Sequence, residues 1–137
     1  MIGIVVTGHG NFATGITSSV KLIAGTPEKY VAVDFKQEDS TDDLENNLKA
    51  AFEELKDCEG GILVFSDLVG GQPYRQSSEL SVKLKDKYNI VVLSGTNLGM
   101  LVECNLSRGF MEDISALADM AVETGKGQVM RYVPEAE

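Results

Sequence analysis

The sequence predicts a single α/β domain with a mainly parallel central sheet and helices on both faces. Short apolar runs alternate with amphipathic stretches of helical spacing through most of the chain, which is typical of strands joined by crossover helices. Residues 62–65 and 90–93 are apolar at every position, as in strands buried on both faces of a parallel sheet. A length of 137 residues suits one well-buried core and is short for two. We therefore assign residues 1–137 to one domain.

The first half of the chain contains two predicted strand–helix units. Residues 2–6 are an apolar run, and apolar side chains then recur at helical spacing over residues 13–23, until Gly-Thr-Pro at residues 25–27 ends the helix. Residues 30–35 are rich in strand-forming side chains. A Ser-Thr pair followed by acidic residues then predicts the start of a second helix, whose apolar face extends over residues 44–55.

The second half continues the alternation. A loop with two adjacent glycines follows the strand at residues 62–65, and its Gln-Pro pair predicts the start of a helix over residues 73–84. Residues 90–94 form the fourth strand, and two further helices are predicted over residues 98–106 and 114–122. Right-handed crossovers between parallel strands are therefore expected.

Residues 127–133 alternate in a way that predicts a last strand. Two helices separate this segment from the preceding strand, and it carries the polar residues Gln128 and Arg131. We expect it at the edge of the sheet, antiparallel to its neighbour or lent to a second subunit.

The charge of the chain excludes some classes of partner. A net charge of −9 and a pI near 4.6, without any cluster of basic residues, argue against binding to nucleic acid or to an anionic membrane. The N-terminal apolar run has no basic leader, and glycines interrupt it long before a signal peptide or membrane span could form. We therefore expect a cytoplasmic protein.

The metal-ligating residues are few and scattered. Cys58 and Cys104 lie far apart in a chain without secretory features, so free thiols are expected. One histidine and two isolated cysteines do not match the spacing of a zinc site, which leaves only a metal held by carboxylates open. The prediction is a site without metal or cofactor.

The candidate functional residues lie in the loops that follow the predicted strands. Ligands of open α/β sheets bind outside the carboxyl ends of the strands, where this chain has loops at residues 7–11, 66–72 and 94–97. The first holds His9, the only histidine, and the second holds Asp67 directly after its strand. Parallel pairing of these two strands would place a carboxylate beside an imidazole.

This pair suits nucleophilic chemistry at the imidazole. A carboxylate that accepts the Nδ1–H of His9 leaves Nε2 unprotonated and stabilises the positive charge that forms when Nε2 attacks a phosphoryl group. Backbone N–H groups at two helix starts would hold the phosphate. The predicted catalytic residues are His9 and Asp67, and the predicted phosphate-binding residues are Gly10, Asn11, Gly70, Gly71 and Gln72.

The same loops lack other phosphate and hydrolase signatures. They contain no lysine or arginine, so a phosphoryl group held there by amides could be released as readily as it is accepted. The chain has no Walker A motif, no dinucleotide fingerprint and no Gly-x-Ser-x-Gly motif.

Three segments resemble one known family. They are Ile-Val-Val-Thr-Gly-His-Gly-Asn-Phe-Ala at residues 4–13, Phe-Ser-Asp-Leu-Val-Gly-Gly-Gln-Pro-Tyr at residues 65–74 and Asn-Leu-Gly-Met-Leu-Val-Glu at residues 97–103. Together they resemble the enzyme IIA component of the mannose family of the bacterial sugar phosphotransferase system (PTS). The likeness covers nearly the whole chain, and the N-acetylgalactosamine-like branch is nearer than the mannose branch.

The resemblance implies a role for each part of the site. His9 would take a phosphoryl group on Nε2 from the phosphocarrier HPr and pass it to a IIB protein, which serves a membrane sugar permease, while Asp67 orients the ring. It also implies a homodimer that exchanges C-terminal strands, and a IIB protein on a separate polypeptide.

Two positions depart from the family pattern, and two other functions remain open. Family members commonly carry a hydroxyl residue after the aspartate and another after the glycine pair, where this chain has Leu68 and Gln72. The Gln72 amide could donate to a phosphate oxygen, whereas Leu68 could not. One alternative function is phosphoryl donor to a dihydroxyacetone kinase, and the other is a non-catalytic regulatory module that binds an anion. The sequence does not indicate which sugar is transported.

Overall fold

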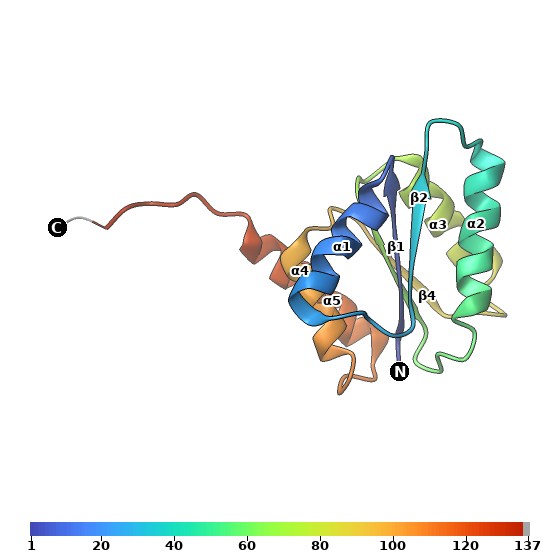
Figure 1. Ribbon diagram of the computed structural model, residues 1–137. Helices are drawn as coiled ribbons and strands as arrows, with labels where there is room; N and C mark the ends of the chain where they lie inside the picture. The colour runs from blue at the N-terminus through green and yellow to red at the C-terminus, as the bar shows by residue number, and fades with distance from the viewer. Residues whose placement is uncertain (136–137) are drawn as a thin grey trace.

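Residues 1–135, the part of the chain that the computed structural model describes, contain four strands and five helices, which alternate as far as α4 and end with a second helix, α5 (Figure 1). In chain order they are β1 (Gly3–His9), α1 (Phe12–Ala24), β2 (Tyr30–Phe35), α2 (Thr41–Glu54), β3 (Ile62–Ser66), α3 (Gln72–Lys83), β4 (Ile90–Leu93), α4 (Leu98–Ser107) and α5 (Ile114–Gln128). The first nine predicted helices and strands are therefore present in the predicted order. Ser40 is the N-cap residue of α2.

The four strands form one parallel sheet in the order β2-β1-β3-β4. β1 lies in the interior of the sheet, with His9 paired to Phe35 of β2 on one side and Thr7 paired to Ser66 of β3 on the other. The carboxyl ends of these strands consequently lie together at one edge of the molecule, which is where the predicted loops meet. The prediction of an α/β fold with a parallel sheet is confirmed.

Helices cover both faces of the sheet (Figure 1). Side chains of α1, α4 and α5 pack with one set of strand residues, which includes Ile4 and Val6, and side chains of α2 and α3 pack with the other set, which includes Val5. The alternation follows from the two-residue period of a strand. β1 and β3 are buried along almost their whole length, as the uninterrupted apolar run at residues 62–65 predicts.

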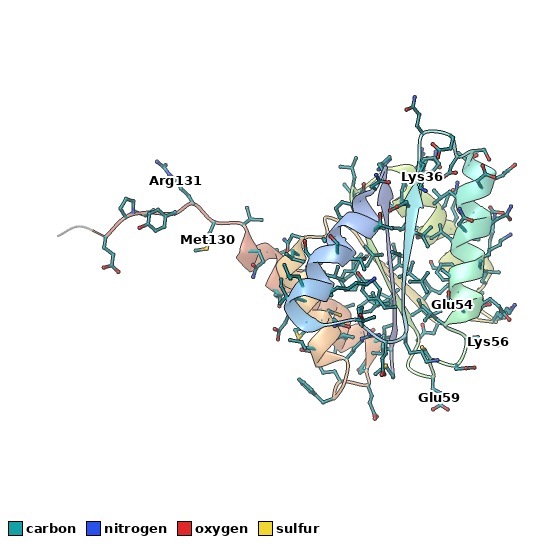
Figure 2. The ribbon with its side chains drawn as sticks, viewed as in Figure 1. Lys36, Glu54, Lys56, Glu59, Met130 and Arg131 are labelled. Atoms are coloured by element: carbon teal, nitrogen blue, oxygen red, sulfur yellow. The ribbon has the colours of Figure 1, made fainter. Side chains whose placement is uncertain are left out.

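The last predicted strand is not formed. Gly127 and Gln128 continue α5, and residues 129–135 extend away from the body of the molecule without pairing to any described strand (Figures 1 and 2). The apolar side chains of this segment are among the most exposed of residues 1–135; they are Val129, Met130, Tyr132 and Val133, at 72–83%. The prediction of an antiparallel edge strand over residues 127–133 is therefore wrong for the single chain, because a strand requires a partner strand and none lies beside this segment.

A buried arginine holds together three segments at the amino-terminal edge of the sheet. Arg108, only 4% exposed, donates from Nη1 to the carbonyl oxygens of Ile2 and Lys29 at 2.9 Å each. Its Nη2 donates to Asn105 Oδ1 at 2.8 Å and to the carbonyl oxygen of Glu28. All four partners are neutral oxygens, and burial lowers the pKa of the guanidinium.

Replacing Arg108 by methionine is expected to lower the free energy of unfolding by about 3 kcal/mol, because the carbonyl oxygens of Ile2, Glu28 and Lys29 would each lose a donor at a buried or partly buried hydrogen bond. Urea unfolding measures this change. Arg75→Met, at an exposed position on α3, is the control and should change stability by less than about 0.5 kcal/mol. A variant of Arg108 as stable as the control would show that the four hydrogen bonds contribute no net stability.

Candidate active site

The structure brings His9 and Asp67 into direct contact. His9 is the last residue of β1, and Asp67 comes directly after Ser66, the last residue of β3. The carboxylate Oδ2 of Asp67 lies 2.9 Å from the ring Nδ1 of His9 and also accepts the backbone N–H of His9 at 2.9 Å. Since an ionised carboxylate can only accept, Nδ1 carries the proton and Nε2 of the neutral ring has a free lone pair.

Asp67 is ionised in this arrangement. Burial raises the pKa of its carboxyl group, but the hydrogen bonds from the His9 backbone and side chain lower it more, so the pKa lies below its ordinary value. The side chain of Asp67 is 13% exposed and that of His9 is 46% exposed. The pair therefore consists of a shielded anion and a ring that solvent or a partner can reach.

Phe35 and Gly71 also contact the His9 ring. The centroids of the Phe35 and His9 rings are 6.1 Å apart, and the rings are tilted by 58°. A Cβ atom placed on Gly71 would lie 2.6 Å from His9 Cε1 and 3.3 Å from Nε2, so only a residue without a side chain fits there with the ring in this position. Phe35 was not predicted as a site residue. The sequence feature that could have indicated Phe35 is its position as the last residue of the predicted second strand.

The N-terminus of α3 lies beside Nε2. Gly71 is the N-cap residue, and it provides no side-chain cap for the first turn. The backbone N–H groups of a first helical turn have no partner within the helix, and the helix dipole places partial positive charge there. Gly70 has a φ of +83°, the left-handed conformation that lets the loop turn into the helix. The Gly71 N–H already donates to the Leu68 carbonyl oxygen at 3.1 Å, so the predicted amide donors left for a group on Nε2 are those of Gly70 and Gln72.

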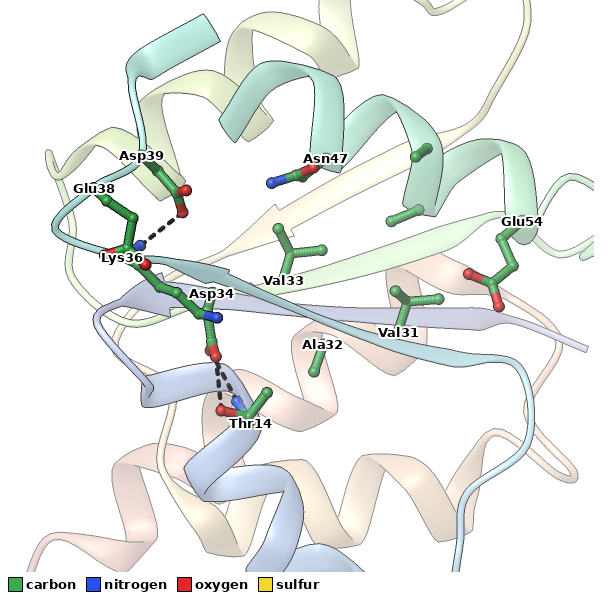
Figure 3. Close-up of a pocket in the computed structure, with 12 residues that line it drawn as sticks. Thr14, Val31, Ala32, Val33, Asp34, Lys36, Glu38, Asp39, Asn47 and Glu54 are labelled. Atoms are coloured by element: carbon green, nitrogen blue, oxygen red, sulfur yellow. Dashed lines mark hydrogen bonds between the residues drawn. The ribbon is translucent and has the colours of Figure 1, made fainter. Parts of the chain in front are cut away.

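The start of α1 is less free to bind an anion. Asn11 is the N-cap residue and forms no side-chain cap hydrogen bond. The backbone N–H of Thr14 donates to Asp34 Oδ1 at 3.0 Å, and its hydroxyl donates to Oδ2 at 2.7 Å (Figure 3). The backbone N–H of Gly10 donates to the Phe35 carbonyl oxygen at 2.7 Å. A carboxylate of the protein therefore already occupies part of this helix start, and Gly10 and Asn11 are weaker phosphate-binding candidates than the α3 residues.

The third predicted loop, at residues 94–97, is hydrogen-bonded to the end of β3. Thr96 donates to the carbonyl oxygen of Ser66 from its hydroxyl at 2.7 Å and from its backbone N–H at 3.2 Å. The Ser66 hydroxyl in turn donates to the Leu93 carbonyl oxygen at 2.6 Å. These bonds fix the end of β3 immediately before Asp67.

Within residues 1–135 the structure has neither a cluster of metal ligands nor a membrane-spanning helix. No three side chains of His, Cys, Asp or Glu gather there in a way that could hold a metal ion. Cys58 and Cys104 are free and buried, and burial raises the pKa of Cys104 to about 12. None of the described helices has the length and apolar character to cross a membrane.

Comparison with known proteins decides the family. Residues 3–122 match the family model EIIA-man, described as "PTS system fructose IIA component". The chain belongs to this family. Over 125 residues it is 30% identical to the mannose-specific EIIAB component of Escherichia coli K12, covering 91% of this chain and 38% of that protein. The chain thus spans well under half the length of that relative.

Solved structures agree with this IIA assignment. The EIIA component from Streptococcus agalactiae is 40% identical, with a TM-score of 0.87 and coverage of 96% of this chain and 97% of that one. The mannose/sorbose-specific IIA subunit from Enterococcus faecalis is 24% identical, with a TM-score of 0.84 and 98% of each chain covered, and supports the fold. The prediction of a mannose-family IIA phosphoryl-transfer component of the PTS is confirmed.

The reactive ring of this IIA chain lies at an open surface. A hollow of about 460 Å³ runs between β2 and α2, with Val31 and Val33 among its lining residues (Figure 3). Neither His9 nor Asp67 lines it. The exposed position of the His9 ring suits reaction with a group carried by another macromolecule better than with a small substrate enclosed in a pocket.

Proposed function

We propose that His9 is a phosphoryl relay: its Nε2 accepts a phosphoryl group from the phosphocarrier HPr and donates it to a IIB protein, which serves a membrane sugar permease. The observation that carries the proposal is the 2.9 Å contact between His9 Nδ1 and Asp67 Oδ2, which leaves Nε2 as the free nucleophile. Incubation with phosphorylated HPr tests it. One acid-labile, alkali-stable phosphate per chain is expected, and absence of any label would overturn the proposal.

In the proposed step, the Nε2 lone pair of His9 forms a bond to phosphorus while the bond between phosphorus and the donor nitrogen breaks. The donor nitrogen keeps that electron pair. The proton stays on Nδ1, and Asp67 stabilises the positive charge that the ring acquires. Amides at the start of α3, including that of Gln72, face the transferred oxygens. With no lysine or arginine at residues 7–11 or 66–72, phosphate is held weakly enough to move onward.

Asp67→Asn is expected to slow phosphoryl transfer to His9 by roughly 10²–10⁴-fold. The asparagine amide can donate to Nδ1, which favours the tautomer that carries its proton on Nε2 and lacks the nucleophile. Rapid-quench labelling with phosphorylated HPr measures the rate. Asp34→Asn is a matched control, because Asp34 accepts from Thr14 and makes no hydrogen bond with His9. Equal rates in the two variants would refute the tautomer argument.

The recipient of the phosphate distinguishes the remaining functions. Transfer from His9 to a IIB protein is expected. Transfer only to a dihydroxyacetone kinase and its bound nucleotide would instead favour the kinase-donor alternative. A chain that never carries phosphate on His9 would be a regulatory module.

The proposal also includes the oligomeric state of the chain, its location and its branch of the family. We propose a cytoplasmic homodimer of single-domain chains that exchange their C-terminal segments as strands, within the N-acetylgalactosamine-like branch. The exposed apolar side chains of Val129, Met130, Tyr132 and Val133 support strand exchange, because nothing within residues 1–135 covers them and a second chain could. Sedimentation of the chain with and without residues 129–137 tests this, and a dimer that survives the truncation would contradict the exchange.

A further inference from the structure

The loop between β3 and α3 exposes two adjacent apolar side chains next to the reactive ring. Leu68 is 58% exposed and Val69 is 66% exposed. The Gly71 N–H donates to the Leu68 carbonyl oxygen at 3.1 Å, which closes the loop into a turn. A Cβ on Gly71 would lie 3.4 Å from that carbonyl oxygen and 3.3 Å from His9 Nε2. The turn that carries Leu68 therefore adjoins the reactive nitrogen.

Packing within the chain does not account for these side chains. Neither Leu68 nor Val69 belongs to either core cluster or packs against one. Other strongly exposed apolar residues include Leu22, near the C-terminal end of α1, and Phe110, shortly after the C-terminal end of α4. Those ends face the opposite edge of the sheet, because crossover helices run antiparallel to the strands. Val129, directly after α5, is also exposed and lines a hollow with Ser94, Gly95 and Asn97 of the loop after β4. Leu68 and Val69 are the exposed apolar side chains of the loop that adjoins the reactive nitrogen.

We propose that Leu68 and Val69 are the apolar docking contact for the phosphocarrier protein that donates the phosphoryl group. This inference rests on the proposed function. A donor has to bring phosphorus into line with His9 Nε2, and a macromolecule that does so at an open surface covers the adjoining turn. The matching partner surface is an apolar patch around the phosphorylated nitrogen, because contact between the two patches excludes water from the transfer. A basic rim on that partner would speed its encounter with a chain of net charge −9.

A comparison of two donors tests the docking contact. The double variant Leu68→Asn/Val69→Thr keeps side-chain size close to the original and makes both positions polar. With phosphorylated HPr as donor, KM is expected to rise about tenfold or more while kcat changes little. With phosphoramidate, a small chemical donor that needs no docking, the rate of His9 phosphorylation should stay within about twofold of wild type. Leu22→Asn, at a position that is 88% exposed on the far edge, is the matched control and should leave both reactions unchanged.

Three results with the double variant would contradict the proposed docking contact. An unchanged KM for phosphorylated HPr in the double variant would show that the partner does not use these side chains. An equal loss with both donors would assign Leu68 and Val69 to support of the site, and altered sedimentation of the double variant would assign them to a contact between copies of the chain. Failure of the wild-type chain to take phosphate from either donor would instead refute the proposed function itself.

Discussion

Replacing His9 by alanine is expected to abolish phosphorylation of the chain completely. His9 is the only histidine in the 137-residue sequence, so no second imidazole can take over its role. The label from phosphorylated HPr should fall from one phosphate per chain to none, as measured by intact-protein mass spectrometry at alkaline pH. His9→Gln is a second variant that keeps a polar side chain of similar reach and should be equally unreactive. Acid-labile phosphate retained in either variant would place the acceptor elsewhere.

The same substitution should leave the fold intact. The His9 side chain is 46% exposed, and the backbone N–H of residue 9 still donates to Asp67 after the ring is removed. The free energy of unfolding is therefore expected to change by no more than about 1 kcal/mol at neutral pH. Circular dichroism and urea unfolding of His9→Ala separate loss of the nucleophile from loss of structure.

This variant also gives a pH dependence with a defined sign. The pKa of Asp67 is lowered in the folded wild-type chain partly by the His9 side chain, so the alanine variant should have a higher Asp67 pKa. A lowered carboxyl pKa stabilises the fold above its ordinary value of 3.8, and that stabilisation is lost as the pH falls through the lowered pKa. The stability difference between the two proteins should therefore be present at pH 7 and shrink near pH 3. A difference that stays unchanged as the pH falls through this range would contradict the assigned hydrogen bond between His9 and Asp67.

The sequence was sufficient to predict the sheet, because a strand buried on both faces is a run of consecutive apolar residues. The unbroken apolar runs at residues 62–65 and 90–93 are what strands covered on both faces require, and these are β3 and β4. Residues 127–133 show the limit of this reasoning. Alternation describes which side chains could share a face, whereas a strand also needs a neighbour, and no part of residues 1–135 provides one.

The site was predictable to the extent that topology determines it. A parallel sheet brings loops after adjacent strands together, which was enough to predict the contact between His9 and Asp67. Phe35 was missed because its role depends on the register of β1 against β2. The contact of Asp34 with the start of α1 was missed for the same reason, since a side chain from a neighbouring strand satisfies donors that look free in the sequence.

Gly70 and Gly71 look alike in the sequence, but the structure requires glycine at the two positions for different reasons. Gly70 has a φ of +83° and no atom within 4 Å of the place where a Cβ would lie, so only its backbone conformation favours glycine. Gly71 has an ordinary φ of −75°, but its Cβ would lie 2.6 Å from His9 Cε1. The requirement at residue 71 is therefore space for the imidazole.

Gly71→Ala is accordingly expected to slow phosphorylation of His9 by about 10²-fold or more. The added methyl group forces the ring to move by a substantial part of an ångström, and misplacement of a reacting group by about 1 Å costs roughly that factor. Displacement of the ring also lengthens the 2.9 Å contact between Nδ1 and Asp67. Phosphoramidate is the donor of choice for this measurement, because a small reagent reports on the ring itself and is insensitive to partner docking.

Gly70→Ala is the matched control for this experiment. Alanine costs about 1 kcal/mol at residue 70 because the left-handed conformation is strained. It costs a similar amount at residue 71 because alanine is a poorer N-cap than glycine. The two variants should therefore unfold at similar urea concentrations, while only Gly71→Ala loses its rate of phosphorylation. Equal rates of phosphorylation in the two variants would show that the start of α3 can shift to accommodate a side chain at residue 71. The close fit between Gly71 and the His9 ring would then have no part in placing Nε2.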